Sequence, residues 1–183
     1  KVKCMKILVP LAEGFEEIEA VTIIDTLRRG GIETVTASLH TPAVTGAHSI
    51  PVTADIILTD DEKWGGIVLP GGMPGSANLK KDPRVIKLIQ KIYESGGIAA
   101  AICAAPIVLA EAGILEGRNY TCYPGYEDEI KTGKFTSEPV TTDGKIITGR
   151  GAACAIPFTL KIVEILKGKE TADKVKGQMM VFW

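Results

Sequence analysis

Short apolar segments that predict strands alternate along the chain with longer segments that predict helices. Met5–Pro10, Gly66–Leu69 and Ile98–Ile102 are short apolar runs, as expected of strands with both faces covered. Glu16–Arg29 instead has apolar residues at helical spacing and is followed by Gly30-Gly31, a common way to end a helix. The spacing predicts an amphipathic helix whose apolar face carries Ile18, Val21, Ile24 and Leu27.

The rest of the chain continues this alternation. Further strands are expected at Thr34–Ser38, Asn119–Cys122, Val140–Thr142 and Ile146–Thr148, with a hairpin or extended pair in Val44–Leu58 and a hairpin turn at Asp143-Gly144. Further helices are expected at Arg84–Ser95, Ala105–Ala112, Cys154–Leu166 and Ala172–Lys176. This order favours an α/β fold, a flavodoxin-like three-layer sandwich with a mostly parallel sheet. Because 183 residues suffice for one well-buried domain and are few for two, residues 1–183 are expected to form a single domain.

Charge and hydropathy argue against two classes of binding partner, nucleic acids and membranes. The 21 basic and 22 acidic residues nearly balance and form no basic stripe, so no nucleic-acid partner is expected. No apolar run reaches the roughly 18 residues that a membrane span needs, and the chain starts with a short strand rather than a secretory signal. We therefore expect no membrane partner and a cytoplasmic location.

The cysteines and histidines indicate neither a disulfide framework nor a metal site. The four cysteines are Cys4, Cys103, Cys122 and Cys154, and the two histidines are His40 and His48. They include no Cys-x-x-Cys pair and no spacing typical of metal ligands. Reduced thiols and no bound metal are expected, and Cys154 is expected to pack inside its helix.

Cys103 stands where a buried strand ends and a helix begins almost at once, with Pro106 in the first helical turn. Such a strand-to-helix junction is a nucleophile elbow. A helix N-terminus directs unpaired N–H groups and a positive dipole end at the thiol, which favours the thiolate and stabilises a nearby oxyanion. Cys103 is therefore a candidate nucleophile. The alternative is a small apolar residue of the core, the usual role of an unpaired cysteine.

Two other features are expected at carboxyl ends of strands, where ligands bind in such sheets. Gly71 and Gly72 lack side chains, so their N–H groups can approach a ligand and form an oxyanion pocket. Glu16 and Glu17, at a helix start, are expected to stabilise the helix dipole. Glu19 is expected to face the core, where a carboxyl near a thiolate has a raised pKa and can act as a general acid or base.

Four ordered motifs resemble those of the ThiJ/PfpI family, in particular its branch that contains the Parkinson-disease protein deglycase. They are Ala12-Glu-Gly-Phe-Glu-Glu-Ile-Glu-Ala20, Leu69-Pro-Gly-Gly-Met-Pro-Gly-Ser-Ala-Asn-Leu79, Ala100-Ala-Ile-Cys-Ala-Ala-Pro106 and Ile147-Thr-Gly-Arg-Gly151. The resemblance implies a flavodoxin-like homodimer with an elbow cysteine, Cys103, hydrogen-bonded to a protonated glutamate, Glu19. It also implies a backbone oxyanion pocket at Gly72 and Ala104.

The chain departs from relatives of this family in ways that bear on its chemistry. Ala104 follows the elbow cysteine where protease-like relatives have a histidine, so a Cys–His protease is poorly supported. Tyr123 stands where some members have a pocket histidine; it can donate a hydrogen bond but is no base at neutral pH. Cys122 is either a second pocket thiol or a half-buried strand residue. His48 either approaches a partner's pocket across a dimer contact or is simply exposed.

The resemblance implies an enzyme that converts small 2-oxoaldehydes such as methylglyoxal to 2-hydroxy acids without glutathione. The same chemistry applied to glycated amines or thiols is a deglycase reaction, and neither reaction needs a cofactor. An alternative from another class is a redox sensor, in which Cys103 is oxidised to a sulfinate stabilised by Glu19. A third is a holdase-like chaperone, for which the sequence offers no distinct feature.

Overall fold

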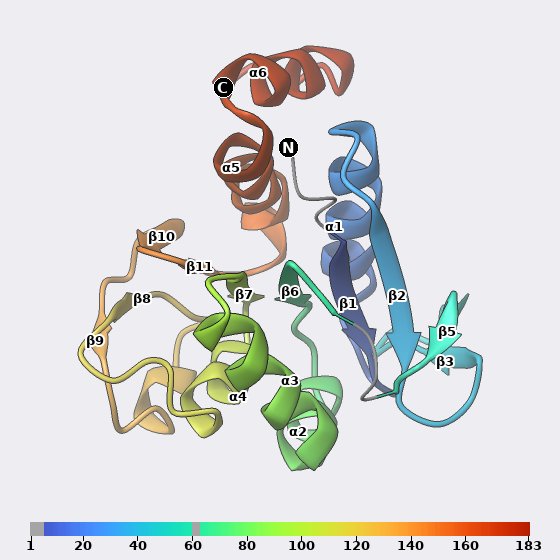
Figure 1. Ribbon diagram of the computed structural model, residues 1–183, viewed down its shortest axis with the longest axis vertical. Coiled ribbons are helices and arrows are strands. Elements are labelled where there is room, and N and C mark those ends of the chain that lie inside the picture. Colours follow the sequence, from blue (N-terminus) through green and yellow to red (C-terminus); the bar gives the residue numbers. More distant parts are fainter. Residues whose placement is uncertain (1–5, 60–62) are drawn as a thin grey trace.

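A parallel sheet with one antiparallel edge strand forms the centre of the protein (Figure 1). The computed structural model describes residues 6–59 and 63–183. Within these residues the order of the seven strands is β10-β11-β7-β6-β1-β2-β5, and only β10 runs antiparallel to its neighbour. The strands are β1 (Ile7–Leu11), β2 (Thr34–Ser38), β5 (Ile56–Ile57), β6 (Gly66–Leu69), β7 (Ile98–Ile102), β10 (Val140–Asp143) and β11 (Ile146–Gly149).

Helices cover both faces of this sheet (Figure 1). One face carries α1 (Glu17–Arg29) and α5 (Ala155–Lys167), with α6 (Lys169–Gln178) packed on α5. The other face carries α2 (Gly75–Lys81), α3 (Pro83–Glu94) and α4 (Pro106–Glu111). Two short pairs lie outside the main sheet: the antiparallel hairpin of β3 (Ala43–Thr45) and β4 (Pro51–Thr53), and parallel β8 (Asn119–Tyr120) and β9 (Lys134–Phe135).

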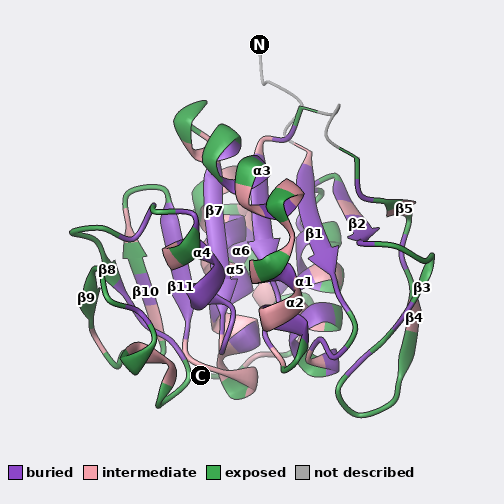
Figure 2. Ribbon diagram, turned by 90° about the horizontal axis from the view of Figure 1, so that it is seen from below, coloured by how far each residue is buried: buried purple, intermediate pink, exposed green. Residues whose placement is uncertain are grey.

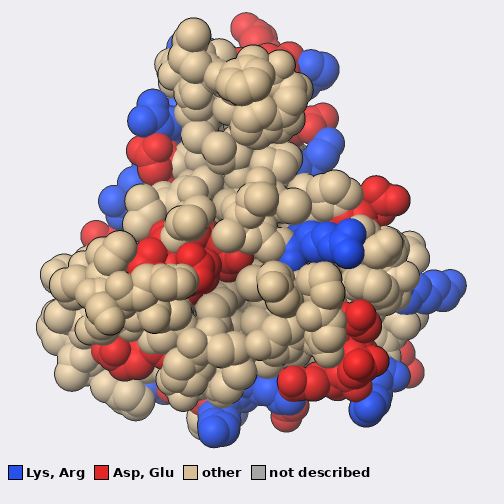
Figure 3. All heavy atoms as spheres, turned by 180° about the vertical axis from the view of Figure 1, so that it is seen from behind, with Lys and Arg blue, Asp and Glu red and all other residues tan. Residues whose placement is uncertain are grey.

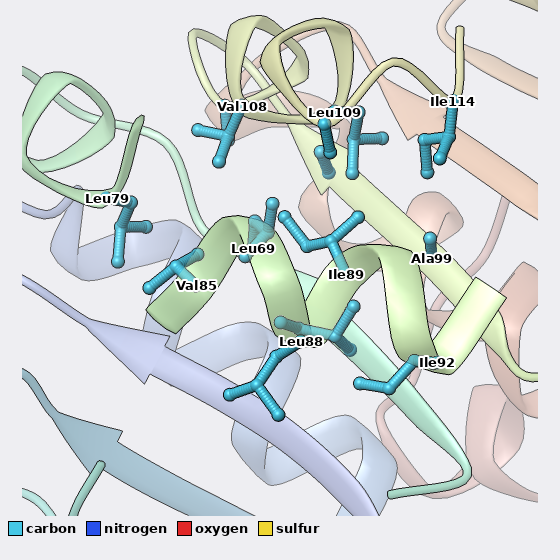
Figure 4. Close-up of a cluster of buried hydrophobic side chains, with 14 of the residues drawn as sticks. Leu69, Leu79, Val85, Leu88, Ile89, Ile92, Ala99, Val108, Leu109 and Ile114 are labelled. Atoms are coloured by element: carbon cyan, nitrogen blue, oxygen red, sulfur yellow. The ribbon is translucent and has the colours of Figure 1, made fainter. Parts of the chain in front are cut away.

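The sheet separates two apolar cores, and its strands are buried between the helices (Figure 2). Alternate residues of each strand face opposite cores, so Ile7 and Val9 pack against α1 and α5 while Leu8 packs with α3. Figure 4 shows the second of these cores, where Leu88 and Ile89 of α3 lie among side chains of β6, β7 and α4. The flavodoxin-like three-layer sandwich predicted from the sequence is confirmed.

The chain reverses its direction of winding between β1 and β6. From β1 it moves to β2 on one side, and it later continues through β6 and β7 on the other side. Loops that leave β1 and β6 at their carboxyl ends therefore diverge, which opens a crevice where such folds bind ligands. Glu19, Gly71 and Cys103 follow β1, β6 and β7, respectively, so the topology gathers them at this edge.

The predicted buried face of α1 is wrong at its first turns. Ile18 is 61% exposed and Val21 is 52% exposed, whereas Glu17 and Glu19 are buried. The Glu17 carboxylate is tolerated here because backbone N–H groups and a histidine satisfy it, whereas Glu19 accepts a backbone hydrogen bond at one oxygen, as described below. Ile23 and Leu27 further along the helix do face the core.

Several element boundaries also differ from the sequence prediction. The strand expected over Asn119–Cys122 ends at Tyr120, and the helix expected over Ala105–Ala112 is limited to Pro106–Glu111. Helix α2 was not predicted at all, because Gly75, Ser76 and Asn78 are typical loop residues. Cys154 ends a 3₁₀ turn (Ala152–Cys154) before α5 and is half-buried, so it does not pack inside the helix.

Charged side chains are spread over the surface of the protein. Figure 3 shows one face of the molecule, on which basic and acidic side chains are interspersed rather than gathered into a basic stripe. Within residues 6–59 and 63–183, no helix is both long enough and apolar enough to cross a membrane.

Candidate active site

Cys103 lies on a strained turn between β7 and α4. Its φ is 63°, in the left-handed region that residues with a side chain seldom adopt. Backbone hydrogen bonds fix this turn: the Cys103 N–H donates to the Gly149 carbonyl at 2.9 Å, and the Cys103 carbonyl accepts from the Tyr123 N–H at 2.9 Å. A conformation of this kind costs about 1–3 kcal/mol and is found mainly at functional sites. The nucleophile elbow predicted from the sequence is present.

Glu19 lies in the first turn of α1 and is completely buried. One carboxyl oxygen, Oε2, accepts a hydrogen bond from the Gly71 N–H at 2.8 Å. The other oxygen, Oε1, is buried and has no hydrogen-bond partner among the described residues. A buried carboxyl with one unsatisfied oxygen favours the neutral form, because burial of a charge without full hydrogen bonding is costly.

Gly71 separates the two side chains and has no room for one of its own. A Cβ atom at this position would lie 2.6 Å from the Cys103 Cβ and 2.6 Å from Glu19 Oε2. The next residue, Gly72, has a φ of 90°, and a Cβ there would lie 2.3 Å from the Glu16 backbone nitrogen. Both glycines are therefore required by close packing and, at Gly72, also by backbone conformation.

Burial opposes the ionisation of both the Cys103 thiol and the Glu19 carboxyl. Burial, followed by the charge of Glu19 and its hydrogen bond, raises the pKa of the Cys103 thiol to about 12. Burial raises the pKa of Glu19 to about 7, although hydrogen bonds from Gly71 and Cys103 work against this. Such closely coupled groups titrate as a pair. The pair therefore retains at least one proton near neutral pH.

The expectation that the helix N-terminus lowers the pKa of Cys103 is wrong, because the pKa of this thiol is raised. Helix α4 has only 6 residues, so its dipole is weak, and burial outweighs it. The Ala104 and Gly72 N–H groups do hydrogen-bond to the sulfur and lower its pKa. A proton on Glu19 removes the carboxylate charge that opposes the thiolate, which leaves burial as the main factor against it.

Tyr123 and Cys122 lie beside the elbow in different settings. The Tyr123 ring is half exposed and meets Tyr126 edge-on, with 6.4 Å between ring centroids. Cys122 is fully buried and outside β8, and its thiol donates to Glu127 at 3.9 Å. Burial and the Glu127 charge raise the pKa of this thiol to about 12, so it stays protonated. Cys122 is therefore not a half-buried strand residue.

His48 interacts with two other glutamates rather than with the Cys103–Glu19 pair. Its Nδ1 lies 3.0 Å from Glu17 Oε2 and 3.5 Å from Glu16 Oε2, and its side chain is 69% exposed. Glu17 also accepts hydrogen bonds from the His48 and Ile50 N–H groups, at 2.7 and 3.3 Å. The prediction that Glu17 only stabilises the helix dipole is therefore wrong: its buried carboxylate holds the β3–β4 hairpin against α1.

Tyr126 is a neighbour of the site that the sequence analysis missed. Burial raises the pKa of its hydroxyl, and the charge of Cys103 raises it further, which places the ring within electrostatic reach of the thiol. The residue lies in a 3₁₀ turn (Tyr126–Asp128) within a loop that has no periodic pattern. In the sequence, only the position of Tyr126 three residues after Tyr123 indicates that its ring lies near the site.

A thiol on a strained elbow, beside a buried carboxyl at the carboxyl edge of a parallel sheet, defines an α/β protein with a candidate cysteine nucleophile. The model of the DJ-1/PfpI family matches residues 5–165, and the chain belongs to this family.

Curated relatives and solved structures support this assignment. The Danio rerio Parkinson disease protein 7 homolog is 36% identical over 181 residues, with 95% of this chain and 96% of that protein covered. The Caenorhabditis elegans protein named glutathione-independent glyoxalase DJR-1.2 is 35% identical over 177 residues, with 94% of each covered. The Arabidopsis thaliana DJ-1 homolog B is 39% identical, but the chain spans only 41% of its length. Drosophila melanogaster DJ-1beta has a TM-score of 0.94 at 36% identity, with 98% and 99% of the two chains covered.

Proposed function

We propose that this protein is a glutathione-independent glyoxalase that converts methylglyoxal-type 2-oxoaldehydes to 2-hydroxy acids, with Cys103 as nucleophile and Glu19 as proton carrier. The observation that carries the proposal is the buried Glu19 carboxyl, which packs against Cys103 across Gly71 and has one oxygen with no hydrogen-bond partner in the part of the chain that the structure describes. The name of the Caenorhabditis elegans relative supports the reaction class.

In the first step, the Cys103 sulfur adds to the aldehyde carbon and a C–S bond forms. The electron pair of the carbonyl moves to oxygen, where the Gly72 and Ala104 N–H groups that hydrogen-bond to the thiol can stabilise the oxyanion. Glu19 then donates its proton to this oxygen. The product is a hemithioacetal, and Glu19 is left as a carboxylate that can act as a base.

In the second step, Glu19 removes the proton from the carbon that bears the sulfur. The resulting enediol is reprotonated on the neighbouring carbon, while the hydroxyl proton of the first carbon moves to the second oxygen. This transfer oxidises the first carbon and reduces the second, so no external oxidant or cofactor is consumed. Water then cleaves the thioester and restores the Cys103 thiol. In an early glycation adduct, the amine or thiol would leave with a proton as the Cys103 sulfur takes its place on the same carbon, and the second step would follow unchanged; this is a deglycase activity.

Oxidation sensing is a second candidate for the same site. One solved relative with a TM-score of 0.94 and 37% identity is titled Toxoplasma gondii DJ-1, oxidized. In this chain, peroxide would convert the Cys103 thiolate to a sulfenate and then a sulfinate, and a protonated Glu19 could donate a hydrogen bond to the sulfinate.

The variant Glu19→Gln separates the two candidates, because glutamine can donate a hydrogen bond but cannot carry a proton. If the protein is a glyoxalase, turnover of methylglyoxal falls by at least about 100-fold in this variant, while peroxide still oxidises Cys103. Glu13→Gln is a matched control, since Glu13 is exposed and should leave turnover intact. Turnover retained in Glu19→Gln would exclude Glu19 as the proton carrier.

We further propose that two copies of the chain associate through an apolar patch formed by Ile18, Val21 and Ile50. Ile18 and Val21 lie one turn apart on α1, and Ile50 lies near the start of this helix, because its N–H donates to Glu17. All three are more than half exposed, and Ile50 is 54% exposed. Clustered exposed apolar side chains beside a functional site are typical of an interaction surface. The family resemblance favours a second copy as the occupant.

A further inference from the structure

Three side chains with metal-ligating atoms converge next to the start of α1. Glu16 and Glu17 come from the α1 N-terminus, and His48 comes from the loop between β3 and β4. One ligand atom from each residue can be chosen so that all three lie within 4.8 Å of one another. Because the two glutamates and the histidine are 31 or more positions apart, no local spacing in the sequence indicates this cluster.

The buried carboxylate of Glu17 is held rigidly in this cluster. Its Oε1 accepts hydrogen bonds from the His48 and Ile50 N–H groups, at 2.7 and 3.3 Å. Its Oε2 is thereby directed at the His48 imidazole, 3.0 Å away. The side chain is only 7% exposed. Hydrogen bonds of this kind to the second oxygen of a carboxylate orient ligands in metal sites.

The charges of the cluster are not balanced by the residues around it. Two carboxylates face a single imidazole, so the cluster keeps a negative charge even when His48 is protonated. Among the described residues, neither Glu16 nor Glu17 forms an ion pair with a lysine or arginine. This remaining negative charge attracts a divalent cation.

We propose that Glu16, Glu17 and His48 bind a divalent cation of the borderline class, of which Zn²⁺ is the representative. Imidazole nitrogen and carboxylate oxygen are ligands that Zn²⁺ accepts at about 2.0–2.2 Å, with ligand atoms about 3.3–3.6 Å apart in a tetrahedral site. The distances of His48 Nδ1 to the two carboxylates, 3.0 and 3.5 Å, are close to this spacing. Neutral His48 would coordinate through Nδ1, and water would complete the coordination sphere.

The bound cation would tie the tip of the β3–β4 hairpin to the first turn of α1. This turn borders the catalytic loop, because the Glu16 N–H donates to the Gly71 carbonyl at 2.9 Å. The site is nevertheless separate from the proposed nucleophile, since it uses neither Cys103 nor Glu19. A cation that binds the folded state alone stabilises it in proportion to the logarithm of its concentration.

Calorimetric titration with ZnCl₂ tests the proposal in the intact chain and in four single variants. We expect one site that persists in Cys103→Ser, which removes the proposed nucleophile, and in His40→Ala, which removes the other histidine. His48→Ala and Glu16→Gln are expected to weaken binding at least about tenfold. Zn²⁺ should also raise the melting temperature of the intact chain and not that of His48→Ala.

Three outcomes would overturn this site. One is Zn²⁺ binding that is equally tight in His48→Ala, and another is binding that disappears in Cys103→Ser, which would assign the cation to the thiol. The third is no heat of binding at millimolar Zn²⁺. His48 is largely exposed, so His48→Ala is expected to remain folded and its result to be interpretable.

Discussion

Cys103 and Glu19 meet across a single backbone position, Gly71, which has space for a hydrogen atom but not for a methyl group. The Gly71 N–H also holds one Glu19 oxygen at 2.8 Å. One residue thus sets both the separation of the thiol and carboxyl and the orientation of the carboxyl. The proposed proton transfer depends on this geometry, because proton carriers act only within hydrogen-bond reach.

Gly71→Ala should therefore disrupt the site more than the fold. The added methyl would lie 2.6 Å from both neighbours, so Cys103 or Glu19 must shift. We expect turnover of methylglyoxal to fall by about 100-fold, the effect of displacing a catalytic group by about 1 Å. Gly177→Ala is the control, because a Cβ on this α6 residue meets nothing within 4 Å. Full activity in Gly71→Ala would show that the tight spacing is not needed.

The positive φ of Cys103 predicts that glycine at this position gives a protein at least as stable as alanine does. Left-handed backbone costs a residue with a side chain about 1–2 kcal/mol, whereas glycine adopts it freely. We expect Cys103→Gly to be at least as stable as Cys103→Ala in urea denaturation. At an ordinary strand position the order reverses, so Ala101→Gly in β7 should lose at least about 0.5–1 kcal/mol. A Cys103→Gly protein less stable than Cys103→Ala by that amount would argue against strain at the elbow.

Acid stability should depend on Asp82, the N-cap of α3. Hydrogen bonds from the Arg84 side chain, together with the Arg84 N–H and charge, hold the pKa of this carboxyl below its usual value, although partial burial opposes them. A depressed pKa in the folded state adds stability above the unfolded pKa of about 3.9. That stability is lost as the pH falls through the folded-state pKa.

Denaturation of Asp82→Asn at several pH values tests this prediction. We expect the variant to be less stable by about 1–3 kcal/mol at pH 7, the usual worth of hydrogen bonds to a charged group. The difference should shrink below about pH 4. Asp25→Asn removes an exposed pair with Arg29 and should change stability by less than about 1 kcal/mol. A difference for Asp82→Asn that does not change with pH would contradict the assigned pKa direction.

Self-association through the α1 patch predicts that a charge at Val21 disrupts it. Val21→Lys places an ammonium in the proposed contact, and we expect sedimentation to show a monomer where the natural chain sediments as a dimer. Met180→Lys is a control at an apolar side chain that is 80% exposed and outside the patch. Dimers of unchanged stability in Val21→Lys would place the contact elsewhere.

The parts of the fold that follow from periodicity were predictable from sequence. The strands Thr34–Ser38, Gly66–Leu69 and Ile98–Ile102 were predicted at their observed bounds. Helix α2 was missed since its glycine, serine and asparagine favour loops, and packing against the sheet overrides that preference. The interaction of Glu17 with residues 48 and 50 was missed for a different reason: it joins segments distant in sequence.

The sequence predicts those residues of the candidate site that directly follow a strand or begin a helix, because the sheet then determines where they lie. Cys103 and Gly71 each follow a parallel strand, so the sheet brings them to one edge, and Glu19 lies in the first turn of the helix that follows β1. The exposure of Ile18 and Val21 could not be predicted, because an apolar stripe can face a core or a partner equally well. The thiol pKa depends on burial and on the Glu19 charge, neither of which local sequence determines.

Lactate formation from methylglyoxal in the absence of glutathione tests the central claim most directly. The natural chain is compared with Cys103→Ser and with Glu19→Gln, each first checked for folding by circular dichroism. The proposed mechanism predicts clear turnover by the natural chain and loss of turnover in both variants. A folded natural chain without turnover, whose Cys103 is converted by peroxide to a stable sulfinate detected by intact mass, would contradict it and favour the sensor.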